Sequence, residues 1–227
     1  MRPLLVCAVL GCGAQSTPQS VTMTAPSSTP QEHVAVPSSS QPFIDAGCIE
    51  SHDELDCSKS KIEGVDVCRF GLRKLDVKLD PPAMVAMCHA DPQKVPHGLH
   101  TSGCKLTSSV IVFAATRNGI VRITSPKELA AAFAPVTTPD EAIAFAELET
   151  GDDRIDKVGR TDDGKPMQTV AIPDGTGWRF DLFRYQSCGC DHPVDSVTYS
   201  VERDGTVTLI ARALARKNAE QSGMCKD

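Results

Sequence analysis

The placement of the ten cysteines constrains the fold of this chain more than any other feature of its sequence. Two of them lie in a short apolar segment at the beginning of the chain, and eight lie after residue 43. An even set of cysteines in an exported chain is typical of a disulfide framework, because oxidising compartments allow thiols to pair. We expect disulfides, in a pairing that the sequence leaves open, at Cys48, Cys57, Cys68, Cys88, Cys104, Cys188, Cys190 and Cys225.

The first twelve residues combine the features of a bacterial export signal. Arg2 supplies a positive charge, and a short apolar run from Leu4 to Leu10 follows it. That run is too short to cross a bilayer, which takes about 20 residues. The segment Val9-Leu10-Gly11-Cys12 resembles the lipobox of bacterial lipoprotein precursors, a family in which the cysteine becomes the new N-terminus and carries the lipid.

This resemblance implies a signal peptide over residues 1–11 and lipidation, including palmitate, at Cys12. Gly13 stands where an Asp often retains such proteins at the inner membrane, so the resemblance implies an outer-membrane location in the bacterial envelope. The membrane is then the expected partner through the anchor, together with an unidentified envelope protein or peptide. A leader of eleven residues is shorter than the usual range of about 15–30, and an ordinary N-terminus stays open as the alternative.

Residues 12–43 are expected to be a disordered, lipid-anchored tether that begins at Cys12. Of the 31 residues from 13 to 43, 20 are Ser, Thr, Pro or Gln, and only Glu32 is charged. Such a stretch cannot bury enough apolar surface to offset its chain entropy. We expect it to lift a single cysteine-rich domain over residues 44–227 away from a membrane. An unselected disordered terminus is the alternative.

The charge of the chain argues against nucleic acid as a partner. The formal net charge is −6, and Lys and Arg are not gathered in a basic patch. Aromatic residues make up only 4% of the chain. We therefore expect disulfides to contribute part of the stability, since the loss of a native bridge costs about 2–5 kcal/mol.

Two short helices are predicted by a repeated capping signal. Ser125-Pro-Lys-Glu128 and Thr138-Pro-Asp-Glu141 each place a capping hydroxyl before a proline at the first helical position and a glutamate at the third. The first signal opens residues 129–133, which Pro135 closes. The second opens residues 142–150, and Gly151 is the stop.

Strands are predicted on both sides of these helices. Asn118-Gly119 between two β-branched runs is the strongest short hairpin signal, because both central residues must take positive φ. The alternation of Val197, Tyr199, Val201, Val207 and Leu209 predicts one apolar face. Other predicted segments are a stapled loop at 48–57, a strand at 75–79, a loop at 91–104, and strands at 155–160, 167–172 and 178–182. The order predicts an α+β fold, an antiparallel sheet with a pair of short helices on one face, stabilised by disulfides.

Residues 138–212 are similar to PepSY-type modules. Those modules place an Asp/Glu-Ala-Ile-Ala-like helix before strands that end in an Asp-Gly hairpin. The matching residues are Asp140-Glu141-Ala142-Ile143-Ala144 and Asp204-Gly205, whereas Cys188-Gly189-Cys190 is not part of the pattern. The resemblance implies a small periplasmic binding or inhibitory module.

Cys188-Gly189-Cys190-Asp191-His192 is the sharpest candidate for chemistry. A disulfide between Cys188 and Cys190 would close a small strained ring, and strain makes such a bond more oxidising. His192 could lower the pKa of a neighbouring thiol, since the thiolate is the nucleophile. These features suggest a periplasmic thiol-disulfide protein. The alternative is that each sulfur pairs with a distant cysteine.

A copper or zinc site is a further alternative. Soft and borderline ligands gather around residues 84–104, and thiolate, imidazole and thioether groups suit these metals. The competing interpretation is a histidine-bearing surface loop stapled by Cys88 and Cys104, because thiols outside the cytosol tend to oxidise. The candidate ligands are Met84, Met87, Cys88, His89, His97, His100, Cys104 and His192.

No hydrolase signature, P-loop or dinucleotide fingerprint occurs in the sequence. The acidic pairs Asp152-Asp153 and Asp162-Asp163 lie beside glycines and are expected to be solvated turn carboxylates. We therefore assign no catalytic, cofactor-binding or metal-ligating residue and expect no cofactor. The sequence favours an envelope lipoprotein that acts by binding or scaffolding rather than by catalysis.

Overall fold

The computed structural model describes residues 40–69, 71–75, 79, 84–116, 119–157 and 159–217. The chain divides into two units, residues 1–35 and 36–227, and every described residue belongs to the second. The expected leader, the expected lipidation site at Cys12 and the cysteine at Cys225 lie outside the described residues. Helix α1 (Gln41–Asp45) overlaps the last residues of the expected tether, and its Phe43 is fully buried.

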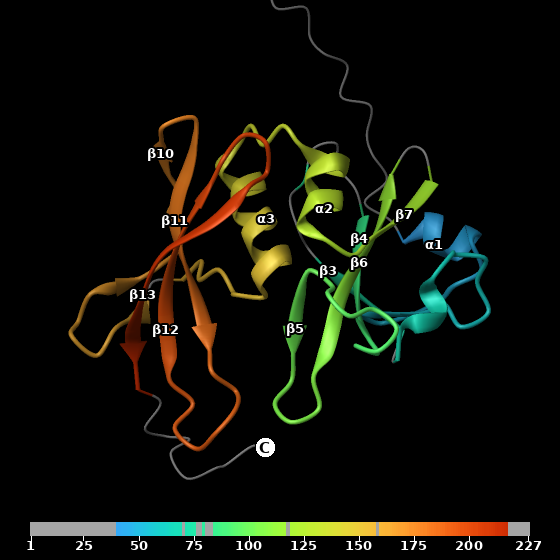
Figure 1. Ribbon diagram of the computed structural model, residues 1–227, viewed down its shortest axis with the longest axis horizontal. Coiled ribbons are helices and arrows are strands. Elements are labelled where there is room, and N and C mark those ends of the chain that lie inside the picture. The colour runs from blue at the N-terminus through green and yellow to red at the C-terminus, as the bar shows by residue number, and fades with distance from the viewer. Residues whose placement is uncertain are drawn as a thin grey trace, which may run out of the picture. The chain divides into compact units, whose positions relative to one another are not determined.

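The fold is α+β, with antiparallel sheets and a pair of short helices, as predicted from the sequence (Figure 1). The strands form two main sheets rather than one. The first sheet has seven strands in the order β1-β2-β3-β4-β6-β5, with β7 also paired to β6. Its strands are β1 (Ile49–Ser51), β2 (Glu54–Asp56), β3 (Leu72–Leu75), β4 (Met84–Ala90), β5 (His100–Ser102), β6 (Ser108–Thr116) and β7 (Gly119–Ile123).

The second sheet contains four antiparallel strands in the order β10-β11-β12-β13. A separate two-stranded ribbon pairs β8 with β9. This ribbon is much shorter than the predicted strands at 155–160 and 167–172, since it pairs only Gly159 with Met167 and Arg160 with Pro166. The strands are β8 (Gly159–Arg160), β9 (Pro166–Met167), β10 (Ile172–Asp174), β11 (Gly177–Tyr185), β12 (Val194–Val201) and β13 (Val207–Arg216).

Both capped helices form where the sequence predicts them. In α2 (Pro126–Phe133), the Ser125 hydroxyl accepts a hydrogen bond from the Glu128 amide. In α3 (Pro139–Thr150), Thr138 and Glu141 form a complete capping box, and Gly151 ends the helix with φ 71°. These N-cap hydrogen bonds satisfy backbone amides that would otherwise lack partners at the start of each helix. The described residues also contain helix α1 and the short 3-10 helix η1 (Val65–Val67).

The two helices share one apolar core with the inner faces of both sheets. Phe133 of α2 and Phe145 of α3 join Val112 of β6, and Phe180 and Val197 of the second sheet, in this core. Helix α3 contacts β5, β11, β12 and β13, and α2 contacts β7. None of the helices in the described part of the chain is long and apolar enough to span a membrane.

Strand β6 is buried on both faces, because a second core covers the outer face of the first sheet. Its seven central residues are all buried. Ile111 and Phe113 face this second core, where they meet Phe43, Leu55 and Leu72. Two disulfides lie in this second core. Cys48–Cys57 joins the strands of the β1–β2 hairpin, as expected for the loop at 48–57. Cys68 bonds to Cys88 of β4. The sequence had suggested Cys88 with Cys104, so that pairing was wrong.

Strand β13 is an edge of the second sheet and is largely exposed. Among the described residues it pairs only with β12, and the register shifts between Thr198 and Tyr199. Val197, Tyr199 and Val201 are buried as predicted, whereas Leu209 is 54% exposed because the helices cover the sheet only as far as β12 and the start of β13. The edge also exposes Ile210 and Leu214, followed by Arg216 and Lys217.

Candidate functional site

A pocket of about 820 Å³ lies between the two sheets at the C-terminal end of α3. One wall comes from β5 and its flanking loops, and the other from the ends of β11, β12 and β13. Its size falls within the range of about 300–1,000 Å³ that is usual for small-molecule sites. Among the residues that line it are His97, His100, Glu149, Asp152, Arg184, Tyr199 and Arg212.

The Cys104–Cys188 disulfide ties the two walls of this pocket together. Cys104 follows β5 and Cys188 follows β11, so the bond joins segments 84 residues apart in the sequence. Cys188 itself lines the pocket. The bond therefore limits how far the β5 loop can move from the second sheet.

A cluster of the buried residues Asp152 and Tyr199 and the partly exposed Arg184 forms part of the pocket lining. Arg184 donates to both carboxylate oxygens of Asp152, from Nε at 2.6 Å and from Nη2 at 3.0 Å. The Tyr199 hydroxyl donates to Asp152 Oδ2 at 2.6 Å and accepts from Arg184 Nη2 at 3.3 Å. The Asp152 side chain is only 1% exposed, so its charge depends on these partners.

Burial and the neighbouring carboxylate affect how this cluster ionises. Burial first, and then the hydrogen bond to Asp152, raise the pKa of Tyr199 to about 12. The hydrogen bond to Asp152 raises the pKa of Arg184 further above its ordinary value. At neutral pH, Tyr199 is therefore a neutral hydrogen-bond donor and Arg184 a fixed cation.

The loop that carries Asp152 is fixed on both sides. Gly151 turns the chain at the end of α3, and Asp153 exchanges backbone hydrogen bonds with Phe183 of β11 at 3.0 and 2.9 Å. Arg154 then returns to α3, where Nη2 binds Glu147 Oε2 at 2.8 Å and Nε donates to the same carboxylate. Helix and sheet together hold the backbone that presents Asp152.

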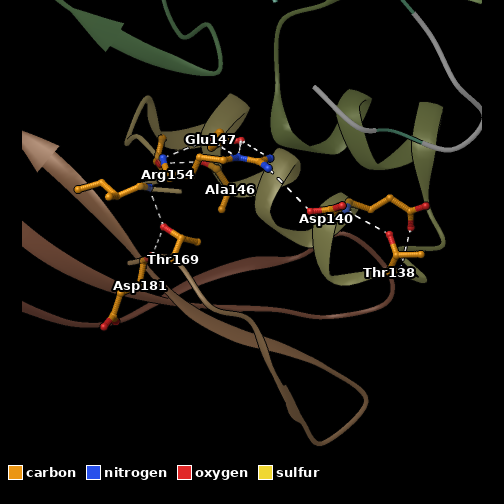
Figure 2. Close-up of polar contacts among 10 residues, drawn as sticks. Thr138, Asp140, Ala146, Glu147, Arg154, Thr169 and Asp181 are labelled. Atoms are coloured by element: carbon orange, nitrogen blue, oxygen red, sulfur yellow. Dashed lines mark hydrogen bonds and ion pairs between the residues drawn. The ribbon is translucent and has the colours of Figure 1, made fainter. Parts of the chain in front are cut away.

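Figure 2 shows how this arrangement continues away from the pocket. Arg154 lies between Glu147 and Asp140 of α3, and its Nη1 is 3.8 Å from Asp140 Oδ1. Beyond it, the Thr169 hydroxyl accepts from the Ile155 amide and donates to the Asp181 carbonyl of β11. These contacts connect α3, the 151–155 loop and the second sheet along one side of the site.

A second guanidinium lies two strands away from Arg184, across β12. Arg212 of β13 contacts Asp195 Oδ2 through Nε at 2.7 Å and Nη2 at 2.5 Å. Gln186 donates to the same oxygen at 2.7 Å. Asp195 pairs with Arg184 in the strand register, so one nearly buried carboxylate is flanked by both arginines.

Glu149 is the one acidic residue of the pocket lining that has no counter-charge among the described residues. Its carboxylate has no hydrogen-bond or ion-pair partner among the described residues. Partial burial without a partner raises its pKa to about 7. A partly buried carboxylate without a counter-charge is often part of a functional site, because a ligand can supply the missing positive charge.

His100 separates this pocket from a smaller one of about 390 Å³. Its Nδ1 is 3.1 Å from the Leu148 carbonyl oxygen, which favours the neutral tautomer with the proton on Nδ1. Burial lowers the pKa of His100, in agreement with a neutral ring. A Cβ on Gly151 would lie 2.6 Å from His100 Nε2, so the glycine is needed for this close approach. The smaller pocket is lined in part by Arg73, His89 and Asp153.

Of the candidates predicted from the sequence, His97, His100 and Cys188 line this pocket. Cys188 is bonded to Cys104 and not to Cys190, and Cys190 is itself disulfide-bonded. His192 is buried, with its ring stacked on Tyr185 at a centroid distance of 5.9 Å. The arrangement matches the alternative in which Cys188 pairs with a distant cysteine.

The candidate metal ligands are dispersed in the structure. Cys88 and Cys104 are in disulfides, while His97 lines the larger pocket, His89 the smaller one and His100 both. No group of three or more His, Cys, Asp or Glu side chains able to hold a metal occurs within the described residues. Asp152 was wrongly expected to be a solvated turn carboxylate, since it is buried.

Sequence reasoning missed the arginines and the tyrosine of the site, although a signal for them exists. Trp178, Phe180 and Leu182 face the core, and the next residue of that face is Arg184. A charged residue at a position that the apolar periodicity assigns to the core indicates a buried polar site, whereas a charged residue on the exposed face indicates nothing special. The same reasoning applies to Asp195, which precedes Val197 and Tyr199 on β12. No protein-family model, no curated protein and no solved structure matches this chain.

Proposed function

We propose that this protein is a lipid-anchored binding module of the bacterial cell envelope, that it holds a small polar ligand in the pocket between its two sheets, and that it performs no catalysis. The anchor would be Cys12, as the lipobox resemblance implies. The single observation that carries the proposal is the preformed polar pocket of about 820 Å³.

The pocket is organised before any ligand arrives. Asp152, Arg184 and Tyr199 fix one another by charge-assisted hydrogen bonds, which are the strong ones. The Cys104–Cys188 bond holds the opposite wall. A site whose side chains are already immobilised loses little further conformational entropy on binding. This rigidity favours recognition of a ligand over a scaffolding role without a ligand.

The binding proposal is tested by nuclear magnetic resonance on the full chain, exported and labelled with ¹⁵N-arginine. The protein is titrated with mixtures of amino acids and short peptides, sugars, nucleotides and dicarboxylates. We expect at least one mixture to shift the Nε–H signals of Arg184 and Arg212. Arg179 is the matched control, because it is paired to Asp174 on the opposite face of the second sheet and is exposed to the same extent as Arg212. If no mixture shifts Arg184 or Arg212, the pocket is not a ligand site.

The envelope half of the proposal has its own test. We expect Cys12→Ala to abolish lipid attachment and to release the protein from membranes, measured by mass spectrometry of the N-terminal peptide and by fractionation. Cys7→Ala is the matched control, because bulky Val6 precedes Cys7 where the lipobox has a small residue. Unchanged membrane association of the Cys12 variant would contradict the anchor.

A further inference from the structure

The donors and acceptors of the large pocket restrict the chemistry of its ligand. Arg184 and Arg212 each use Nε and Nη2 on a carboxylate of the protein, Asp152 and Asp195 respectively. The Nη1 group of each has no hydrogen-bond partner among the described residues. Two guanidiniums that are anchored along one edge can therefore present their remaining N–H donors to an oxyanion.

The acidic side of the pocket places a second requirement on the ligand. The charges of Asp152 and Asp195 are already matched by the two arginines. Glu149 lines the same pocket at the end of α3 with no partner in the described part of the chain. A ligand that brought only negative charge would add repulsion beside this carboxylate, whereas an ammonium group would pair with it.

We propose that the pocket binds a short peptide through its two charged ends, the C-terminal carboxylate at Arg184 and Arg212 and the N-terminal ammonium at Glu149. This assignment rests on the proposed binding function and names the ligand class for the same site. A pocket of about 820 Å³ has room for more than a single amino acid. His97 and His100 line the space around these groups and offer polar contacts to the peptide backbone.

The raised pKa of Glu149 agrees with this assignment. Burial without a counter-charge raises it to about 7, so the empty pocket holds a carboxylate that is costly to ionise. An ammonium group of the ligand removes that cost by supplying the missing cation. The pocket is thus complementary to a zwitterion rather than to a simple anion.

The experiment uses four tripeptide libraries, each randomised at all three positions. One has both ends free, one is N-acetylated, one is C-amidated, and one is blocked at both ends. Binding to the exported full chain is measured by affinity selection and mass spectrometry. We expect the library with free ends to bind at least about tenfold more tightly than either singly blocked library, as for the loss of one charge-assisted pair.

Variants of the chain separate the two ends. Glu149→Gln is expected to remove the preference for a free N-terminus and to keep the preference for a free C-terminus. Arg212→Gln is expected to do the reverse, and Arg212→Lys to fall between it and the native protein, because Lys keeps a cation beside Asp195. Arg179→Gln, the control on the opposite face, should keep both preferences.

Each outcome decides the assignment. Equal or tighter binding of the acetylated library would show that the pocket takes an anion and would overturn the zwitterion. Equal binding of the doubly blocked library would show that the ends are not read. If no tripeptide binds while another mixture shifts the arginine signals in the preceding test, the peptide assignment is wrong and the binding function stands. If neither experiment detects a ligand, both fail.

Discussion

Removing the Cys104–Cys188 bond should destabilise the protein more than removing Cys48–Cys57, although burial alone gives the opposite order. Cys48 and Cys57 are buried in the second core, at 4% and 2% exposure, whereas Cys188 is exposed. A cavity argument therefore assigns the larger loss to the short bridge. The chain-entropy argument assigns it to the long one, because a longer loop gains more freedom when the bond is removed.

The magnitudes follow from the sequence separations of 84 and 9 residues. Loop-closure entropy gives a loss of about 4.6 kcal/mol for the double variant Cys104→Ala/Cys188→Ala and about 2.6 kcal/mol for Cys48→Ala/Cys57→Ala. With a urea dependence of about 2 kcal/mol per molar, the unfolding midpoint should fall by roughly 2.3 M and 1.3 M.

Urea unfolding can be followed by the fluorescence of Trp178, the single tryptophan, which packs against the main core. The slope of the transition should be compared among the variants, since a changed slope signals a changed unfolded state. An equal loss in the two variants, or a larger loss for Cys48–Cys57, would refute the chain-entropy reasoning. In that case, packing in the second core would dominate the contribution of these bridges.

Three further substitutions test the site. Tyr199→Phe removes the hydroxyl that donates to Asp152 at 2.6 Å, and should lower the free energy of unfolding in urea by about 1.5–3 kcal/mol. Glu149→Gln tests the pH dependence of stability. The pKa of Glu149 is raised from 4.5 to about 7 by folding, so the folded state binds more protons than the unfolded state between these two pH values. The contribution of Glu149 to stability is therefore present below pH 4.5 and is lost as the pH rises through 7. The urea midpoint of the native protein should accordingly fall more between pH 5 and pH 8 than that of Glu149→Gln, and equal falls would contradict the assignment. Gly151→Ala forces a side chain into positive φ and against His100, so calorimetry should show a loss of more than about 1 kcal/mol.

The local elements of this fold were predictable because their signals are local. The caps at Ser125 and Thr138 act within one helical turn, and β6 and β7 pair as the predicted hairpin, with Gly119 opposite Thr116 in the register. Asn118, which was predicted as a central residue of that turn, lies outside the described residues. The division into two sheets was not predictable in this way. It depends on which strands meet across the helix pair, and a pattern with a period of two residues specifies a face but not a partner.

The sequence predicted some residues that line the pocket, but not the charged cluster within it. The sequence singled out His97, His100 and Cys188, which line the pocket, but for reasons of metal or redox chemistry. It assigned Asp152 to a solvated turn because Gly151 precedes it, whereas contacts with Arg184, 32 residues away, bury it. The periodicity of β11 places Arg184 on the core face of the sheet, but it does not identify Asp152 as its partner.

The exposed edge of β13 has a consequence for how the protein behaves in concentrated solution. A strand edge that has no partner among the described residues and carries Leu209, Ile210 and Leu214 is a template for pairing with another chain. Two features oppose this: the irregular register with β12, and the positive charges of Arg216 and Lys217 near its end. Charge repulsion acts over a Debye length of about 10 Å at 0.1 M salt but only about 3 Å at 1 M. We therefore expect edge-to-edge association of this protein to increase between 0.1 M and 1 M salt, where the repulsion between these charges is screened.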